Sequence, residues 1–237
     1  MSLLWILVWI LSDIFILLCR PFLTRSQLMP IHNEITPSSY SFGPYLASFE
    51  VDPEFCKKLL KAGRKLKTPW NKHLVGHINY ERLYDHNDES LVRGFAPYIN
   101  GWMEGWKKFS EAPAYDKNLQ GWKFTQLWIN IQKAGEYNPI HTHTNCDLSM
   151  VLFLKVPKGM NQEKNIRNGA PNGSLSFIHG QESDLFITDR VFAPEEGKLF
   201  IFPGRLRHHA TAFESKGERI SVAGNVAWVP KRWEDRR

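Results

Sequence analysis

The chain has 237 residues, a length that fits one domain with or without an extension. Hydrophobic residues make up 43% and charged residues 23%, which excludes a wholly disordered chain and a polytopic membrane protein. The net charge of +6 is compatible with an anionic ligand, a nucleic acid or a membrane surface, and selects none of them. Three cysteines without a C-x-x-C pair argue against a zinc ribbon and a disulfide scaffold, and favour a reducing compartment.

Residues 1–28 form a hydrophobic N-terminal segment. Residues 3–18 read LLWILVWILSDIFILL, which is almost wholly apolar but shorter than the roughly 20 residues that cross a bilayer. One interpretation is a membrane anchor over residues 3–23, followed by Arg25, which would leave the main domain in the cytoplasm. The other interpretation is an upstream stretch ahead of a start at Met29. We expect a cytoplasmic protein, with the membrane tether as an open alternative.

Residues 29–237 are predicted to form a single domain, with supporting helices over 52–112. A first strand is expected within residues 40–51. Asp52 and Pro53 are typical of a helix start, because they supply an N-cap and a proline at the first helical position. A second helix is expected from Ser90, kinked or broken at Pro97.

The rest of the domain, over residues 121–230, is predicted to consist of strands. The apolar runs are WKFTQLWINIQ, LSMVLFLKVP, GSLSFIHG, GKLFIFPG and RISVAGNVAWV, separated by Gly, Pro, Asn and Asp. Residues 158–173 are polar and rich in turn formers, so they predict an exposed loop. Helices followed by strands indicate an α+β protein whose strands close into a sandwich or jelly roll.

Two histidine pairs indicate a metal site. His141 and His143 are two residues apart, so on an extended segment they point to the same side. His208 and His209 are neighbours on a predicted strand, so only one of them can face the same cavity. Three imidazoles suit iron, zinc, copper or nickel, whereas the alternative is that these residues only cap strand ends. The remaining histidines are taken as non-functional: His32, His73, His77, His86 and His179.

Arg219 and Ser221 indicate an anion site. They alternate with Ile220 and Val222 and therefore share one face of a strand. A buried guanidinium needs an anionic partner, and a ligand carboxylate would pair with it in bidentate fashion. A salt bridge to an internal carboxylate, such as Glu195 or Glu196, would satisfy the same need.

Three segments resemble the iron(II)- and 2-oxoglutarate-dependent oxygenases, in the form common in marine phages and bacteria. These segments are YNPIHTHTNCDLSMVLFLKVP, EEGKLFIFPGRLRHH and ERISVAGNVAW, and the resemblance spans residues 128–228. It implies a double-stranded β-helix, which is a jelly roll, with N-terminal supporting helices. His141 and His208 correspond to the first and the distal iron ligand, whereas Arg219 and Ser221 correspond to the residues that bind 2-oxoglutarate. Trp128 and Asn130 are implied to line the same pocket.

The metal-ligand motif departs from the family at one position. The usual ligand set is two histidines and a carboxylate, but the position two residues after His141 is His143. His143 is the favoured third ligand, and Asp147 is the alternative; two histidines with water is a third reading. A neutral third ligand removes one negative charge, which is expected to weaken Fe(II) retention and shift its potential.

The resemblance implies a dioxygenase that uses Fe(II), 2-oxoglutarate and dioxygen to hydroxylate a peptidyl side chain or a small metabolite. A cupin-like metalloenzyme without 2-oxoglutarate and a non-catalytic jelly-roll binding module are the alternatives. Nucleic-acid binding is not expected, because the sequence contains no recognised nucleic-acid-binding motif.

Overall fold

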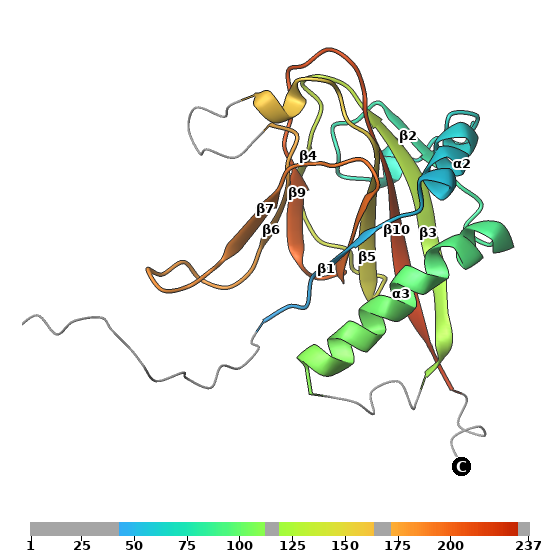
Figure 1. Cartoon of the computed structure of the whole chain (residues 1–237), viewed down its shortest axis with the longest axis vertical. Helices are drawn as coiled ribbons and strands as arrows, with labels where there is room; N and C mark the ends of the chain where they lie inside the picture. Colours follow the sequence, from blue (N-terminus) through green and yellow to red (C-terminus); the bar gives the residue numbers. More distant parts are fainter. Residues whose placement is uncertain (1–42, 112–118, 164–171, 232–237) are drawn as a thin grey trace, which may run out of the picture. The chain divides into compact units, whose positions relative to one another are not determined.

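The computed structural model describes residues 43–111, 119–163 and 172–231, and residues 41–237 form one unit (Figure 1). The hydrophobic segment 1–28 lies outside the described residues, so the anchor over residues 3–23 stays a prediction. None of the described helices combines the length and the apolar character needed to cross a bilayer.

The described chain folds into two antiparallel sheets and two long helices. The helices are α2 (Pro53–Gly63) and α3 (Glu89–Phe109), with 3₁₀ turns at Asn71–His73 and Met160–Gln162. The strands are β1 (Ala47–Glu50), β2 (Tyr80–Leu83), β3 (Leu119–Gln132), β4 (Asn138–His141), β5 (Leu148–Lys155), β6 (Leu175–Ile178), β7 (Asp189–Phe192), β8 (Lys198–Pro203), β9 (Arg207–Ala210) and β10 (Arg219–Pro230). The larger sheet has the order β1-β8-β5-β10-β3-β2, and the smaller has the order β4-β9-β6-β7.

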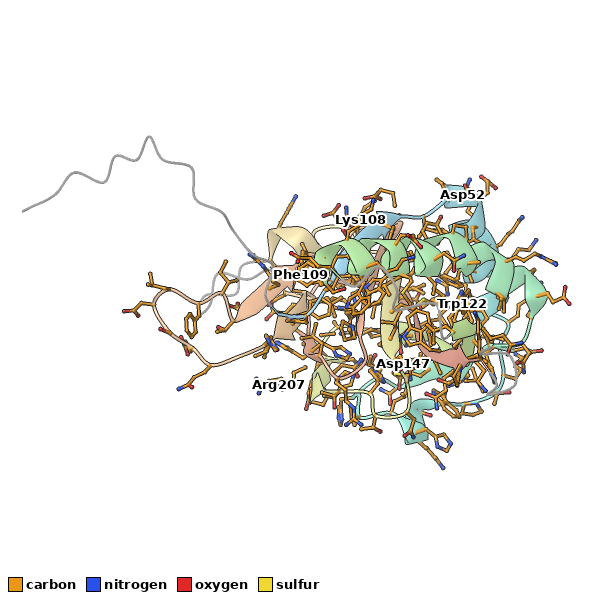
Figure 2. All side chains as sticks on the ribbon, turned by 90° about the horizontal axis from the view of Figure 1, so that it is seen from below. Asp52, Lys108, Phe109, Trp122, Asp147 and Arg207 are labelled. Carbon is orange, nitrogen blue, oxygen red and sulfur yellow. The ribbon has the colours of Figure 1, made fainter. Side chains whose placement is uncertain are left out.

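The larger sheet separates two hydrophobic layers. Leu148, Met150 and Leu152 of β5 belong to the core that the sheet forms with the helices. Val151 and Phe153 point to the opposite face, where they pack in the second cluster, between the sheets. Figure 2 shows side chains filling the layer between α3 and the strands. The prediction of an α+β jelly roll with N-terminal supporting helices is confirmed.

The two helices begin where the sequence predicts. The side chain of Asp52 accepts a hydrogen bond from the Glu54 N–H at 3.1 Å, and Pro53 opens α2. The cap of α3 is Asp88, two residues ahead of the predicted start.

A kink or a break was expected at Pro97, and the break is wrong, because α3 runs through the proline. The helix continues to Phe109, although Pro97 cannot donate a backbone hydrogen bond. Phe95 and Ile99, on either side of the proline, are completely buried in the core. Their burial explains why the helix continues, because tertiary packing outweighs one missing hydrogen bond.

The strand predictions succeed where the apolar runs are long. The five predicted runs correspond to β3, β5, β6, β8 and β10. The predicted strand within residues 40–51 is shorter than expected, since β1 covers only Ala47–Glu50 of it. Strands β2, β4, β7 and β9, of four residues each, were not predicted as runs of their own.

Replacing Phe95 tests the helix-to-sheet core. Its ring packs edge-on against Phe55 and Phe124, with ring centroids 5.1 and 5.6 Å apart. We expect Phe95→Ala to lower the free energy of unfolding by about 3–5 kcal/mol, as measured by urea denaturation. Leu185→Ala is the control, because Leu185 is 93% exposed and its loss should change little. A loss below about 1 kcal/mol for Phe95→Ala would contradict this packing.

Candidate active site

Three histidines meet at the edge of the smaller sheet. His141 of β4 lies directly opposite His208 of β9, and their ring centroids are 4.2 Å apart. His143 follows β4, and its backbone N–H donates a hydrogen bond to the Gly204 carbonyl at 2.8 Å. Its ring centroid lies 5.2 Å from each of the other two. One nitrogen from each ring lies within 4.8 Å of the others, so the three side chains can hold one metal ion.

Backbone carbonyls orient two of these rings. His141 Nδ1 lies 2.7 Å from the Pro139 carbonyl, and His208 Nδ1 lies 2.8 Å from the Leu206 carbonyl. Because a carbonyl can only accept, Nδ1 is the protonated donor in both rings. The Nε2 lone pairs of His141 and His208 are therefore free to bind a metal. This is the usual arrangement of metal-binding histidines, in which the second nitrogen is fixed by a carbonyl or a carboxylate.

Burial keeps the three imidazoles neutral. It lowers the pKa of His208 to about 3 and that of His143 to about 4, with a further lowering from the neighbouring histidines. The pKa of His141 is lowered as well, mainly by burial. Neutral imidazole is the form that binds metals, so the cluster needs no proton release at neutral pH. The donor set, the orientation and the protonation state together fit a divalent ion such as Fe(II).

The structure does not bring Asp147 into this cluster. One oxygen of its carboxylate accepts the Trp228 N–H at 2.7 Å, which ties the side chain to β10 (Figure 2). Asp147 is also absent from the described residues that line the cavity at the histidines.

The histidine cluster opens into a cavity between the sheets. The cavity has a volume of about 130 Å³ and is partly open to solvent. Trp128, Asn130, Ser221 and Arg219 all line it. The Trp128 indole N–H donates to Asn130 Oδ1 at 3.0 Å, and Asn130 Nδ2 donates to Ser221 Oγ at 3.3 Å. These hydrogen bonds hold the three polar side chains in a row across β3 and β10.

Arg219 has no carboxylate partner among the described residues. Its side chain is 3% exposed, and one terminal N–H donates to the Gly173 carbonyl at 2.5 Å. Its Nε is buried without any hydrogen-bond partner. The internal salt bridge considered from the sequence is not present, and Glu196 instead accepts the Val156 N–H. Desolvation lowers the pKa of Arg219 to about 10, so it remains a buried cation that requires an anion.

Sequence reasoning missed two parts of the cavity wall. His73, taken as non-functional, lines the cavity with Leu74 and Val75. Glu81 on β2 lines it too, and its side chain is completely buried. The signal for Glu81 was weak, because β2 is only four residues long and shows no clear alternation. His77 stacks on Tyr137, whereas His32 lies outside the described residues.

Glu81 is predicted to make stability depend on pH. Burial, and secondly the negative charge of Glu136, raises the pKa of Glu81 from 4.5 to about 7. Between these pH values the folded chain holds a proton that the unfolded chain releases, so folding stability falls as pH rises. Glu81→Gln removes this loss. The difference in free energy of unfolding between Glu81→Gln and the natural chain should shift in favour of the variant by about 2–3 kcal/mol from pH 4 to pH 8.

Urea denaturation at pH 4, 6 and 8 measures this difference. The control is Glu104→Gln, whose carboxylate is 63% exposed and pairs with Lys107 on the surface of α3. That variant should follow the natural chain at every pH, because exposed ion pairs contribute little. A gap between Glu81→Gln and the natural chain that stays constant with pH would show that Glu81 titrates normally.

A protein-family model matches the strand-rich part of the chain. Residues 126–225 match the sequence model of a family described as "Putative 2OG-Fe(II) oxygenase". A search of curated protein sequences found no match.

Two solved structures illustrate the likeness in fold. One is the viral collagen prolyl hydroxylase of Paramecium Bursaria Chlorella virus-1 in its 2-oxoglutarate complex. It is 12% identical, with a TM-score of 0.50 over 78% of this chain and 96% of that chain. The other is SnoN, a non-heme α-ketoglutarate-dependent epimerase from nogalamycin biosynthesis, 11% identical with a TM-score of 0.50 over 78% and 79% of the two chains. At these identities the likeness shows a shared fold. The match to the oxygenase family model covers residues 126–225, less than half of the chain, and the two structures agree with it in fold.

Proposed function

We propose that this chain is a hydroxylase whose iron is held by His141, His143 and His208. Arg219 binds the distal carboxylate of 2-oxoglutarate, and Ser221 donates a hydrogen bond to the same carboxylate. Trp128 and Asn130 form the wall beside it. The substrate is a peptidyl side chain or a small metabolite.

The observation that carries this proposal is the isolated charge of Arg219. Three histidines alone suit a cupin-like metalloenzyme equally well, and that alternative predicts an internal salt bridge for Arg219. No described carboxylate lies within ion-pair distance of Arg219, although it is 3% exposed and lines the histidine cavity. A dicarboxylate co-substrate supplies the missing anion and leaves its other end for the metal.

The residues of the chain position the reactants and keep water away from them. Iron and 2-oxoglutarate, when bound, supply the oxidising power for hydroxylation. The carbonyls of Pro139 and Leu206 hold the Nε2 atoms of His141 and His208 toward the metal position. The guanidinium of Arg219 orients the co-substrate, and its Cζ lies over the Phe153 ring, 5.3 Å from the ring centroid. Without a carboxylate ligand, the site binds iron through neutral donors only.

Succinate formation tests the proposed function. The full chain is supplied with Fe(II), 2-oxoglutarate, ascorbate and air, and succinate is quantified against reactions that lack one component. We expect slow succinate formation that requires both iron and dioxygen and that is absent in His208→Ala. Iron-loaded protein that forms no succinate would overturn the proposal.

A further inference from the structure

Glu81 is a buried carboxylate without a partner in the wall of the active-site cavity. Its side chain is 0% exposed, and neither oxygen has a hydrogen-bond partner among the described residues. Burying a carboxylate is costly unless it is neutralised or paired. A partner from outside the chain would remove this cost, and the cavity that Glu81 lines is where such a partner would enter.

None of the described neighbours of Glu81 forms a hydrogen bond with its carboxylate. Asn130 lies directly opposite Glu81 in the β2–β3 pair, but its amide is already bonded to Trp128 and Ser221. Glu136 is the charged residue that raises the pKa of Glu81, and it has the same sign as Glu81. The carboxylate of Glu136 is itself satisfied by the N–H groups of Asn79 and Lys133.

The cavity therefore has one negative and one positive side chain on different strands. Among the described lining residues, Glu81 is the only acid, and Arg219 is the only lysine or arginine. Glu81 is on the edge strand β2, Arg219 is on β10, and β3 lies between them in the sheet. Asn130 and Ser221 continue the row that Glu81 begins. The two charges thus lie on separate strands in the wall of one cavity.

We propose that Glu81 binds a cationic nitrogen group of the substrate, so that the substrate is a basic amine or guanidine compound, free or as a peptidyl side chain. This inference rests on the proposed function, in which Arg219 is occupied by 2-oxoglutarate. A cation entering a cavity that also holds a divalent metal and Arg219 needs a counter-charge of its own, and Glu81 supplies it. A neutral N–H donor would satisfy the oxygens but would leave a buried net charge. An ammonium or guanidinium group donates hydrogen bonds to the oxygens and also neutralises the buried charge.

Binding of matched probes tests this inference without iron or 2-oxoglutarate. The full chain at pH 8 is titrated by calorimetry with N-acetyl-lysinamide, N-acetyl-argininamide and N-acetyl-norleucinamide. We expect at least one cationic probe to bind at least tenfold more tightly than the neutral norleucine compound. Glu81→Gln should abolish this preference, whereas Glu104→Gln should keep it.

Three results would overturn the inference: equal affinity for all probes, no binding of any probe, or a preference that survives in Glu81→Gln. The circular dichroism spectrum and the urea midpoint of Glu81→Gln show whether the variant is folded. Because Glu81 is not an iron ligand, Glu81→Gln should still form the anaerobic complex with Fe(II) and 2-oxoglutarate. If the natural chain forms that complex but shows no cation preference, only the substrate class is overturned. If the natural chain does not form the complex, the proposed function is overturned.

Discussion

Arg219→Ala is expected to bind 2-oxoglutarate at least about 100-fold more weakly, because it removes the partner of a buried carboxylate. Its affinity for Fe(II) should change by less than about threefold, since Arg219 is not a metal ligand. Anaerobic calorimetric titration with Fe(II) and then with 2-oxoglutarate measures the two affinities. The control Arg93→Ala removes a guanidinium that is 73% exposed on α3, and it should change neither.

The two alternatives for Arg219 give opposite results in this experiment. If Arg219 binds the co-substrate, the loss appears in 2-oxoglutarate affinity and Ser221→Ala shows a smaller loss of the same kind. If 2-oxoglutarate affinity is unchanged in Arg219→Ala, the site does not use this residue for the co-substrate. That result would favour a metalloenzyme with a different chemistry.

His208→Ala is expected to lower Fe(II) affinity by more than about 100-fold, because it removes one of three protein ligands. The His208 ring centroid lies 4.2 Å from that of His141 and 5.2 Å from that of His143, and its Nδ1 is fixed by the Leu206 carbonyl. Competition with a chromogenic chelator under anaerobic conditions measures the affinity. His179→Ala is the matched control, because His179 is an exposed histidine outside the cavity. Unchanged iron affinity in His208→Ala would remove His208 from the ligand set.

The third ligand has its own diagnostic substitution. His143→Asp replaces the neutral imidazole with the carboxylate of the usual ligand set. If His143 is a ligand, this variant should keep or strengthen Fe(II) binding, whereas His143→Ala should weaken it. Equal affinity in both variants would mean that His143 does not contact the metal.

The sequence predicts the parts of the fold that depend on long local patterns. The apolar runs of β3, β5, β8 and β10 are rich in strand-forming residues and bounded by turn formers, so strands can be inferred, although burial on both faces leaves little alternation. Four-residue strands such as β2 and β4 carry no such pattern. Pro97 was expected to kink or break α3, and the break does not occur because Phe95 and Ile99 anchor the helix on both sides of the proline.

The histidine cluster could be predicted only in part. The i, i+2 spacing places His141 and His143 on one side, and the resemblance indicates His208 rather than His209. That His141 lies directly opposite His208 depends on the register of β4 with β9, which no local pattern specifies. The assignment of these side chains as ligands remains a proposal.

The charges of the cavity wall required the structure. The sequence leaves open whether Arg219 pairs with Glu195 or Glu196, since their separation in space depends on how β8 and β10 are placed. Glu81 sits on a strand that reaches the cavity only through its pairing with β3. Whether a charged group is left without a partner is a property of the whole fold, and sequence patterns do not report it.

Anaerobic absorption spectroscopy tests the central claim most directly. Metal-free full chain receives Fe(II) and then 2-oxoglutarate, and the visible metal-to-ligand charge-transfer band is followed. Our account predicts a band that requires both additions, that needs more 2-oxoglutarate in Arg219→Ala, and that is absent in His208→Ala. Bound iron without a band, or a band that is unchanged in His208→Ala, would contradict the assignment of this cavity as an iron and 2-oxoglutarate site.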